Sequence, residues 1–449
     1  MATVAAAVAA ALPAVAGVTA PGWSTPHTTS ATTDGSYAAG ASGGVQLFGT
    51  GGAPTRTAQL RAIKQDATQG RAVGVNAGAP GFDIEDVSIN DSGQLIGAWS
   101  IDTESISTNV NIGAALGVRT SLPRTATVLP SGALIAEVQT AIDTNGTGVV
   151  AWIQSTPVGQ SVQAATLQTG QAPIIAQLIV LPTTLEVLNL DVGFDGSHHP
   201  VVTWSVGPDN APGPGSIGVA RGNGQGGFAP AVETQVDTTL LNKLQTFVTS
   251  DGGLLALWAT GGPGTIGTTA TTPISVRFSQ AGPTGPWSAA QTVITGATGG
   301  ALPSFAANAS GRAAVLFPLA TSGGTTLRSV LRTTAGTWGT VRLLGPSGAR
   351  RIGRANVGVD STGRVVALWD DAGGGSSQPA RVLAARSSSS SNPLNTYNQV
   401  AQRKGDQRCN TPSLAPASTG DGLGSWSCLS SSTGAVTSPR LARLTAPGS

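Results

Sequence analysis

The twelve residues 360–371, "DSTGRVVALWDD", determine the interpretation of the whole chain. They combine a polar turn ending in Gly363, an uninterrupted apolar stretch, and Trp369 six residues after the glycine. An Asp in a turn bonds its own backbone and a Gly supplies a positive φ, so "DSTG" predicts a tight hairpin turn. The stretch "RVVALW" is apolar at both parities, which indicates a strand covered on both faces.

The same pattern recurs along the chain at intervals of 51 to 59 residues. Each copy is called a unit here and takes the name of its aromatic anchor residue. Six anchors follow a glycine by six residues, whereas Gly196 precedes Trp204 by eight, which predicts a hairpin lengthened by "SHHP". A fixed period of this length is the signature of a repeat architecture. The anchors are Phe48, Trp99, Trp152, Trp204, Trp258, Phe317, Trp369 and Trp426.

Each unit continues beyond its anchor with a third strand, such as "ARVLAARS", and a fourth. A "G-x-W" turn joins these two strands at Trp287 and Trp338, and "GGF" at Phe228 is a degenerate copy. Four antiparallel strands per unit, with buried inner strands, predict a β-propeller blade. We therefore predict an all-β fold, a single β-propeller of eight four-stranded blades, or seven if the Phe48 unit is not a blade. Immunoglobulin-like tandems and a β-helix are the alternative architectures.

The anchors are predicted to fill the space between neighbouring blades. A ring of Trp side chains that binds sugars is the functional alternative to this packing role.

The last unit lacks a fourth strand, and the segment "PGWSTPHTTS" at residues 21–30 has the matching pattern. We expect this N-terminal strand to pair with the strand around 439–446, which would close the ring and remove two open sheet edges. Cys409 and Cys428 fall opposite each other in a hairpin of the same unit, so a disulfide is predicted. Two free buried thiols are the alternative.

The first 20 residues form a signal-like, Ala/Val-rich segment without charge, and the propeller domain is expected over 21–449. The basic n-region is missing, so the true start could lie upstream. This segment predicts a secreted or cell-surface protein, a monomer, with no membrane span after signal removal. A net charge of +2 gives no reason to expect a nucleic-acid partner, and no cofactor is expected.

The "D-x-x-G-x-x-x-x-x-W" hairpin resembles that of the sialidase-like and related secreted bacterial β-propellers. The resemblance covers roughly residues 21–449 and implies the fold. A sialidase-like site would also need a nucleophilic Tyr paired with Glu and an Arg cluster. Only Tyr37 and Tyr397 exist, and Tyr397 lies in a Ser-rich insert. The resemblance therefore concerns the fold.

Polar residues gather at both ends of the predicted blades. The hairpin turns carry Asp91, Asp143, Asp195, Asp251 and Asp360, which are interpreted as turn residues because calcium needs more oxygen ligands than each turn offers. His198 and His199 lie in one such turn and are expected to face solvent. No catalytic or metal-ligating residue is assigned. The candidate ligand-binding residues of the opposite, loop face are Asp102, Glu104, Asp209, Asp370 and Asp371, together with Arg350, Arg351 and Arg354.

Two functions agree with this pattern. The first is a secreted, non-catalytic binding or scaffold module for a carbohydrate or protein ligand. The second is a divergent glycoside hydrolase or lyase in which paired loop carboxylates act as acid and base. Carboxylates clustered with Arg near the propeller axis on the loop face would favour the enzyme. An axis with apolar residues or without such a cluster would favour the binding module.

Overall fold

The structure of this chain is a computed structural model. No helix is assigned among the residues that it describes, so the predicted all-β fold class is confirmed for this part of the chain. None of these residues belongs to a helix with the length and apolar character that crossing a membrane requires. The described residues are 27–28, 35–51, 56–75, 85–101, 110–209, 213–239, 241, 243–260, 274–297, 303–321, 324–345, 352–371, 381–387, 394, 398–402, 408–417, 422–429 and 440–444.

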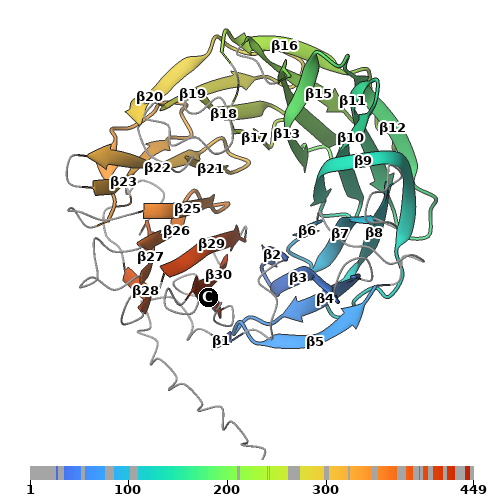
Figure 1. Ribbon diagram of the computed structural model, residues 1–449, viewed down its shortest axis with the longest axis horizontal. Coiled ribbons are helices and arrows are strands. Elements are labelled where there is room, and N and C mark those ends of the chain that lie inside the picture. Colours follow the sequence, from blue (N-terminus) through green and yellow to red (C-terminus); the bar gives the residue numbers. More distant parts are fainter. Residues whose placement is uncertain are drawn as a thin grey trace, which may run out of the picture.

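The strands form antiparallel sheets that follow one another around a common centre in chain order (Figure 1). The first sheet contains β2 (Ser36–Gly40), β3 (Gly43–Thr50), β4 (Thr57–Ile63) and β5 (Gln69–Gly74). The sheet of the Trp204 unit contains β13 (Leu185–Phe194), β14 (Pro200–Pro208), β15 (Gly215–Arg221) and β16 (Val232–Asp237). The sheet of the Trp258 unit contains β17 (Leu244–Val248), β18 (Leu254–Thr260), β19 (Ile274–Ala281) and β20 (Gln291–Ala297).

The remaining four-stranded sheets are built in the same way. The Phe317 unit contains β21 (Ser304–Ala307), β22 (Ala313–Thr321), β23 (Gly324–Arg332) and β24 (Arg342–Leu343). The Trp369 unit contains β25 (Ile352–Val359), β26 (Val365–Asp371), β27 (Arg381–Arg386) and β28 (Asn398–Gln402). The last sheet has the order β1-β31-β30-β29, with β1 (His27–Thr28), β29 (Arg408–Pro416), β30 (Gly422–Leu429) and β31 (Arg440–Leu444).

The Trp99 and Trp152 units share one sheet of seven strands, which the sequence did not predict. Its 16-residue strand β9 pairs with β8 up to Ala133 and with β10 from Leu134 onward. Gly132, with a φ of 71°, lies at this junction and lets the strand change partner without a loop. The strands of this sheet are β6 (Glu85–Ile89), β7 (Gln94–Ile101), β8 (Val110–Val118), β9 (Thr127–Ile142), β10 (Gly148–Thr156), β11 (Gly159–Leu167) and β12 (Ile174–Val180).

The Trp anchors lie between neighbouring units, as predicted. Trp204 packs with Ala151 and Ile153 of the preceding unit, and Trp369 packs with Leu316 and Leu327 of the unit before it. Each Trp anchor is at most 2% exposed, so these indoles cannot stack on a sugar. Sugar binding by the set of anchor Trp residues, the functional alternative to their packing role, is therefore excluded.

The two ends of the described chain meet in one sheet. β1 pairs with β31 through His27 opposite Leu441 and Thr28 opposite Arg440. This pairing lies within the one expected between residues 23–30 and the strand around 439–446, and it covers two residues on each strand. Arg443 of β31 also donates to the carbonyl oxygens of Gly40 and Ala41, which links the last sheet to the first.

Candidate functional site

The predicted loop-face carboxylates Asp370 and Asp371 lie at the end of β26 and are buried in the fold. The Asp370 side chain accepts a hydrogen bond from the backbone N–H of Arg354. Burial nevertheless raises the pKa of Asp370 to about 6, because it disfavours the charged form. Asp371 faces the opposite side of the strand, where its Oδ2 lies 2.9 Å from Nη2 of Arg381. Neither carboxylate is therefore directed at a shared ligand position.

The other predicted site residues do not join them. Asp209 is exposed directly after β14, and its backbone N–H donates to the carbonyl of Thr184. Asp102, Glu104, Arg350 and Arg351 lie outside the described residues. Among the described residues, no group of three or more His, Cys, Asp or Glu side chains is placed to hold a metal ion.

Three carboxylates that sequence reasoning missed lie on the first strands of three successive units. These are Asp86 on β6, Glu137 on β9 and Asp191 on β13. The strands β6 and β13 lie at the inner edge of the ring (Figure 1), and Glu137 lies in the half of β9 that pairs with β10 as the first strand of the Trp152 unit. Burial raises the pKa of Asp86 to about 6 and the pKa of Asp191 well above its ordinary value. Burial also raises the pKa of Glu137, and the Asp86 charge adds to this effect.

Asp86 and Asp191 occupy equivalent register positions, each opposite the residue that precedes the anchor. We call this position the polar level, because every unit has a polar residue there. A polar residue four positions before the turn residue is the sequence signal that could have revealed it, for example Asp86 before Asn90. The residues of the polar level are Ser36, Asp86, Gln139, Asp191, Gln245, Ser304, Asn356 and Ser413.

The polar level connects neighbouring units. Asp86 Oδ2 accepts from the backbone N–H and the hydroxyl of Thr140, at 2.7 and 2.8 Å. Asp191 Oδ2 accepts from the N–H of Thr246 at 2.9 Å, and Ser304 Oγ accepts from the N–H of Val357 at 3.2 Å. In all three cases the donor follows the polar level of the next unit. These bonds satisfy backbone groups at an open sheet edge, so they have a structural role.

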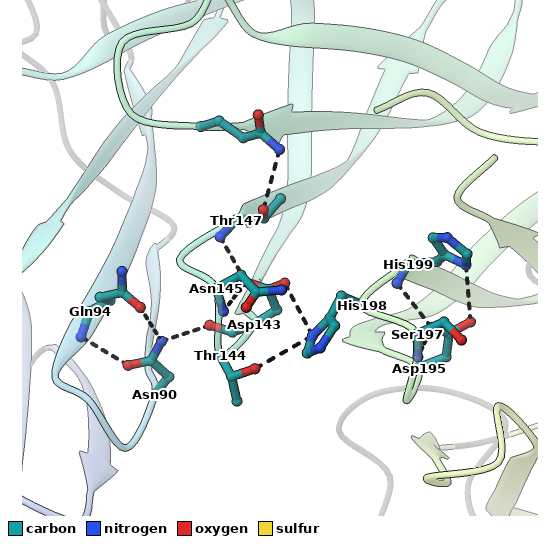
Figure 2. A network of polar contacts seen from close by, with 11 residues as sticks. Asn90, Gln94, Asp143, Thr144, Asn145, Thr147, Asp195, Ser197, His198 and His199 are labelled. Carbon is teal, nitrogen blue, oxygen red and sulfur yellow. Dashed lines mark hydrogen bonds and ion pairs between the residues drawn. The ribbon is translucent and has the colours of Figure 1, made fainter. Parts of the chain in front are cut away.

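The hairpin turns lie on the face of the ring opposite the predicted loop-face site, the turn face. In these turns the side chain of the turn residue accepts hydrogen bonds from backbone N–H groups two and four residues later (Figure 2). Asp143 Oδ1 accepts from the N–H groups of Asn145 and Thr147, at 2.9 and 2.7 Å. Asn90 reaches the next unit, because its Nδ2 donates to the carbonyl of Asp143 at 2.6 Å. The predicted turn role of these residues is therefore confirmed for Asp143.

The prediction of a lengthened Trp204 hairpin is wrong, because this hairpin has the same length as those of the other units. His198, not Gly196, takes the place of the repeated glycine, six residues before the anchor and with a φ of 63°. Gly196 instead lies where a Cβ would collide with the carbonyl oxygen of Ser250. His198 is about half exposed, and its Nδ1 lies 3.4 Å from the buried Oδ2 of Asp143 in the preceding unit (Figure 2). His199 Nδ1 lies 3.6 Å from Asp195 Oδ2.

Two cavities are relevant to ligand binding. One of about 260 Å³ is bordered by β13, β17 and β21 at the inner edge of the ring, and small or apolar residues such as Gly193, Phe247 and Ala307 line it. No carboxylate lines this cavity among the residues that the structure describes.

The larger cavity, about 570 Å³, is a cleft on the turn face between the Trp258 and Phe317 units. We call it the turn-face cleft. Its walls include Asp251, Gln280, Trp287, Ser310 and Arg332. A volume of this size is in the range of small-molecule sites, and its lining combines an aromatic ring with a few polar groups.

No family model matches the sequence, and no curated protein matches it. Solved structures do match at low identity. A prolyl endopeptidase is 12% identical with a TM-score of 0.46, and the match covers 92% of this chain and 53% of that one, so the chain spans about half its length. The polysaccharide lyase Uly1 is 8% identical with a TM-score of 0.45, covering 91% and 89%. An α-L-arabinanase from Penicillium chrysogenum is 13% identical with a TM-score of 0.36, covering 65% and 88%.

Proposed function

We propose that this protein is a secreted, non-catalytic β-propeller that binds a carbohydrate or protein ligand. In this proposal the chain forms a closed ring of eight blades, completed by the pairing of β1 with β31. The eight anchors on eight different strands support the blade number, since each anchor begins a new repeat of the same hairpin.

The observation that carries a binding role rather than catalysis is the engagement of the buried carboxylates. Asp237 accepts from Trp258 Nε1 at 3.0 Å, and Asp360 accepts from the N–H of Arg364 at 2.8 Å. Asp143, Asp370 and Asp371 have the partners described above. A catalytic acid or base needs a proton-transfer atom directed at substrate, and these five buried aspartates are instead directed at the chain itself.

The ligand site in this proposal is the turn-face cleft. It is the larger of the two cavities, it opens to solvent, and exposed polar residues such as Asp251 and Ser310 lie along it. The cavity of about 260 Å³ at the inner edge of the ring is smaller and lined mainly by apolar and small residues, which suits a scaffold better than an acid–base centre.

The test is a glycan array combined with a screen of glycoside hydrolase and lyase substrates, both on the full chain. We expect retention of a glycan or protein ligand without turnover, and reduced retention by the Trp287→Ala variant. Trp287 is part-buried in the cleft wall, so the variant's thermal melt must show a folded protein. Cleavage of any substrate would overturn the non-catalytic role, and unaltered retention by the variant would overturn the cleft as the site.

The second candidate is a glycoside hydrolase or lyase, and the carboxylates on the inner strands favour it. Asp86, Glu137 and Asp191 influence one another's charge, and a carboxyl with a raised pKa is suited to act as a general acid. The hydrogen bonds that Asp86 and Asp191 accept from neighbouring units, and the one that Glu137 accepts from Gln139 on its own strand, are the reason for placing this function second. If the screen finds turnover, Glu137→Gln should abolish it while leaving the melting temperature near that of the wild type.

Secretion and the disulfide belong to the same proposal. The register places Cys409 directly opposite Cys428 on antiparallel strands. Opposed residues of this kind have Cα atoms about 4.5–5.5 Å apart, within the range that a disulfide accepts. An extracellular location would supply the oxidising environment that favours the bond.

A further inference from the structure

The turn-face cleft contains a buried guanidinium group. Arg332, at the end of β23, is 5% exposed. Its Nη1 donates to the carbonyl of Gly311 at 2.5 Å, and its Nη2 donates to Oε1 of Gln280 at 2.6 Å. Its Cζ lies 4.8 Å from the centre of the Phe278 ring. The guanidinium therefore has a fixed position between the Trp258 and Phe317 units.

All these partners of Arg332 are neutral. Within the described part of the chain no carboxylate forms an ion pair with this residue, and its buried Nε has no hydrogen-bond partner. Burial lowers its pKa, and no nearby charge contributes to that change. A buried cation without a counter-charge is costly to a fold, and an anion that completes its pairing would be bound correspondingly well.

The fold itself does not require an arginine at this position. Three units have the same bridge, in which a residue at the end of the third strand pairs with an aromatic residue six positions later. The residue is Gly222 before Phe228 and Ala281 before Trp287, but Arg332 before Trp338. Two sister units form this turn with almost no side chain, so the arginine has a purpose beyond the turn.

The rest of the cleft suits a polyhydroxylated ligand. The exposed Asp251 accepts from the Thr249 hydroxyl at 2.6 Å and from the N–H of Gly253 at 3.2 Å, both through Oδ1. Its carboxylate can accept further hydrogen bonds from sugar hydroxyls. The part-buried Trp287 supplies an apolar wall, and Ser310 and Thr334 supply exposed hydroxyls. An acidic glycan carries hydroxyl donors for Asp251 beside the anionic group for Arg332, whereas the carboxylate side chains of an acidic peptide carry no donor.

We infer that the turn-face cleft binds an acidic glycan, with the carboxylate or sulfate of one sugar paired to Arg332 and neighbouring hydroxyls bound along Asp251 and Trp287. This inference rests on the proposed binding function and names its ligand class. Uronic acids and sulfated sugars present the same chemistry to the guanidinium, and the experiment separates them.

The experiment measures the affinity of the full chain for four polymers at physiological salt: polygalacturonate, dextran sulfate, dextran and polyglutamate. We expect binding to polygalacturonate, dextran sulfate or both, and little to dextran or polyglutamate. Arg332→Ala introduces the residue that the Trp258 unit has at this position, and it should weaken binding about tenfold or more, as expected for loss of a charge-assisted pair. Thr334→Glu adds a negative charge at the exposed rim and should have the same effect without disturbing buried contacts.

The matched controls are Arg342→Ala and Thr340→Glu, which make the same charge changes at exposed positions of the Phe317 unit outside the cleft. Both should bind like the wild type, and thermal melts should show that all variants are folded. Equal loss in the controls, tight binding to polyglutamate, or unaltered binding by Arg332→Ala and Thr334→Glu would each overturn the inference. Retention of a neutral glycan with no acidic preference would overturn it while the proposed binding function stands; no retention of any ligand would overturn both.

Discussion

The replacement Asp86→Asn should stabilise the protein at neutral pH. In the folded protein the pKa of Asp86 is about 6, raised from 3.8 mainly by burial, so folding disfavours its charged form. The N–H and O–H donors of Thr140 both bond to one oxygen, Oδ2, and the amide oxygen of Asn can accept both. The replacement therefore keeps the bond between units and removes the partly buried charge.

The size of the effect follows from the pKa difference. A shift of one unit corresponds to about 1.4 kcal/mol, so a rise of about two units gives an upper value of about 3 kcal/mol. Asp86 is partly accessible to water, so we expect a gain of about 1–3 kcal/mol in the free energy of unfolding at a pH of about 7.5. Loss of this charge also removes its repulsion of the Glu137 and Asp191 carboxylates, whose pKa values the Asp86 charge raises.

The sign of the pH dependence makes the prediction specific. Because the folded state holds the Asp86 proton more tightly than the unfolded state, wild-type stability falls as the pH rises from about 4 to about 6. The gain in Asp86→Asn should therefore be full above a pH of about 6 and vanish near a pH of about 4. The assay is urea unfolding followed by Trp fluorescence on both sides of this window, with Asp209→Asn, at an exposed carboxylate, as the charge control. A less stable Asp86→Asn at the higher pH, or a gain that persists at the lower pH, would refute the reasoning.

Three further outcomes are expected. Gly252 has a φ of 81°, and a Cβ at this position would have its nearest neighbour at 3.6 Å, so Gly252→Ala should cost about 1–2 kcal/mol from backbone strain alone, measured by urea unfolding; an unchanged midpoint would contradict this. Deletion of residues 1–32 removes β1 and leaves β31 as an open edge, so the melting temperature should fall clearly; an unaltered melt would count against ring closure. Mass spectrometry of the unreduced secreted protein should find Cys409 linked to Cys428, a bond worth about 3 kcal/mol for this loop length, whereas two alkylatable thiols would disprove it.

The sequence predicted the repeat because each unit carries its own local signals. A turn glycine and an apolar strand ending in an aromatic anchor are fixed by backbone sterics and burial, which act within about a dozen residues. The same reasoning failed at His198, where a non-glycine residue adopts the positive φ and shifts the alignment by two residues. It also failed at β9, where continuity depends on which neighbour pairs with each half of the strand.

The candidate site was harder to predict because its residues meet across strand and unit boundaries. Asp370 and Asp371 were predicted to face a ligand. Instead Asp370 accepts from the backbone N–H of Arg354, and Asp371 pairs with the guanidinium of Arg381, both on neighbouring strands. Arg332 has no distinguishing motif in the sequence. Its importance depends on contacts to Gln280 and Gly311, and on the absence of any acidic partner among the described residues.

The repeat itself supplies a test for function that a single domain lacks. Where all units place the same kind of residue at one register position, as at the polar level, the common structure is a sufficient explanation. Where one unit departs from its sisters at a position whose geometry is unchanged, the fold does not account for the departure. Arg332 meets this condition, because Gly222 and Ala281 support the same bridge without a side chain that could bind a ligand. Its charge is also buried without a counter-ion among the described residues. The chain supplies neutral partners for Arg332 but no counter-charge among the described residues, so the counter-charge is expected to come from a ligand.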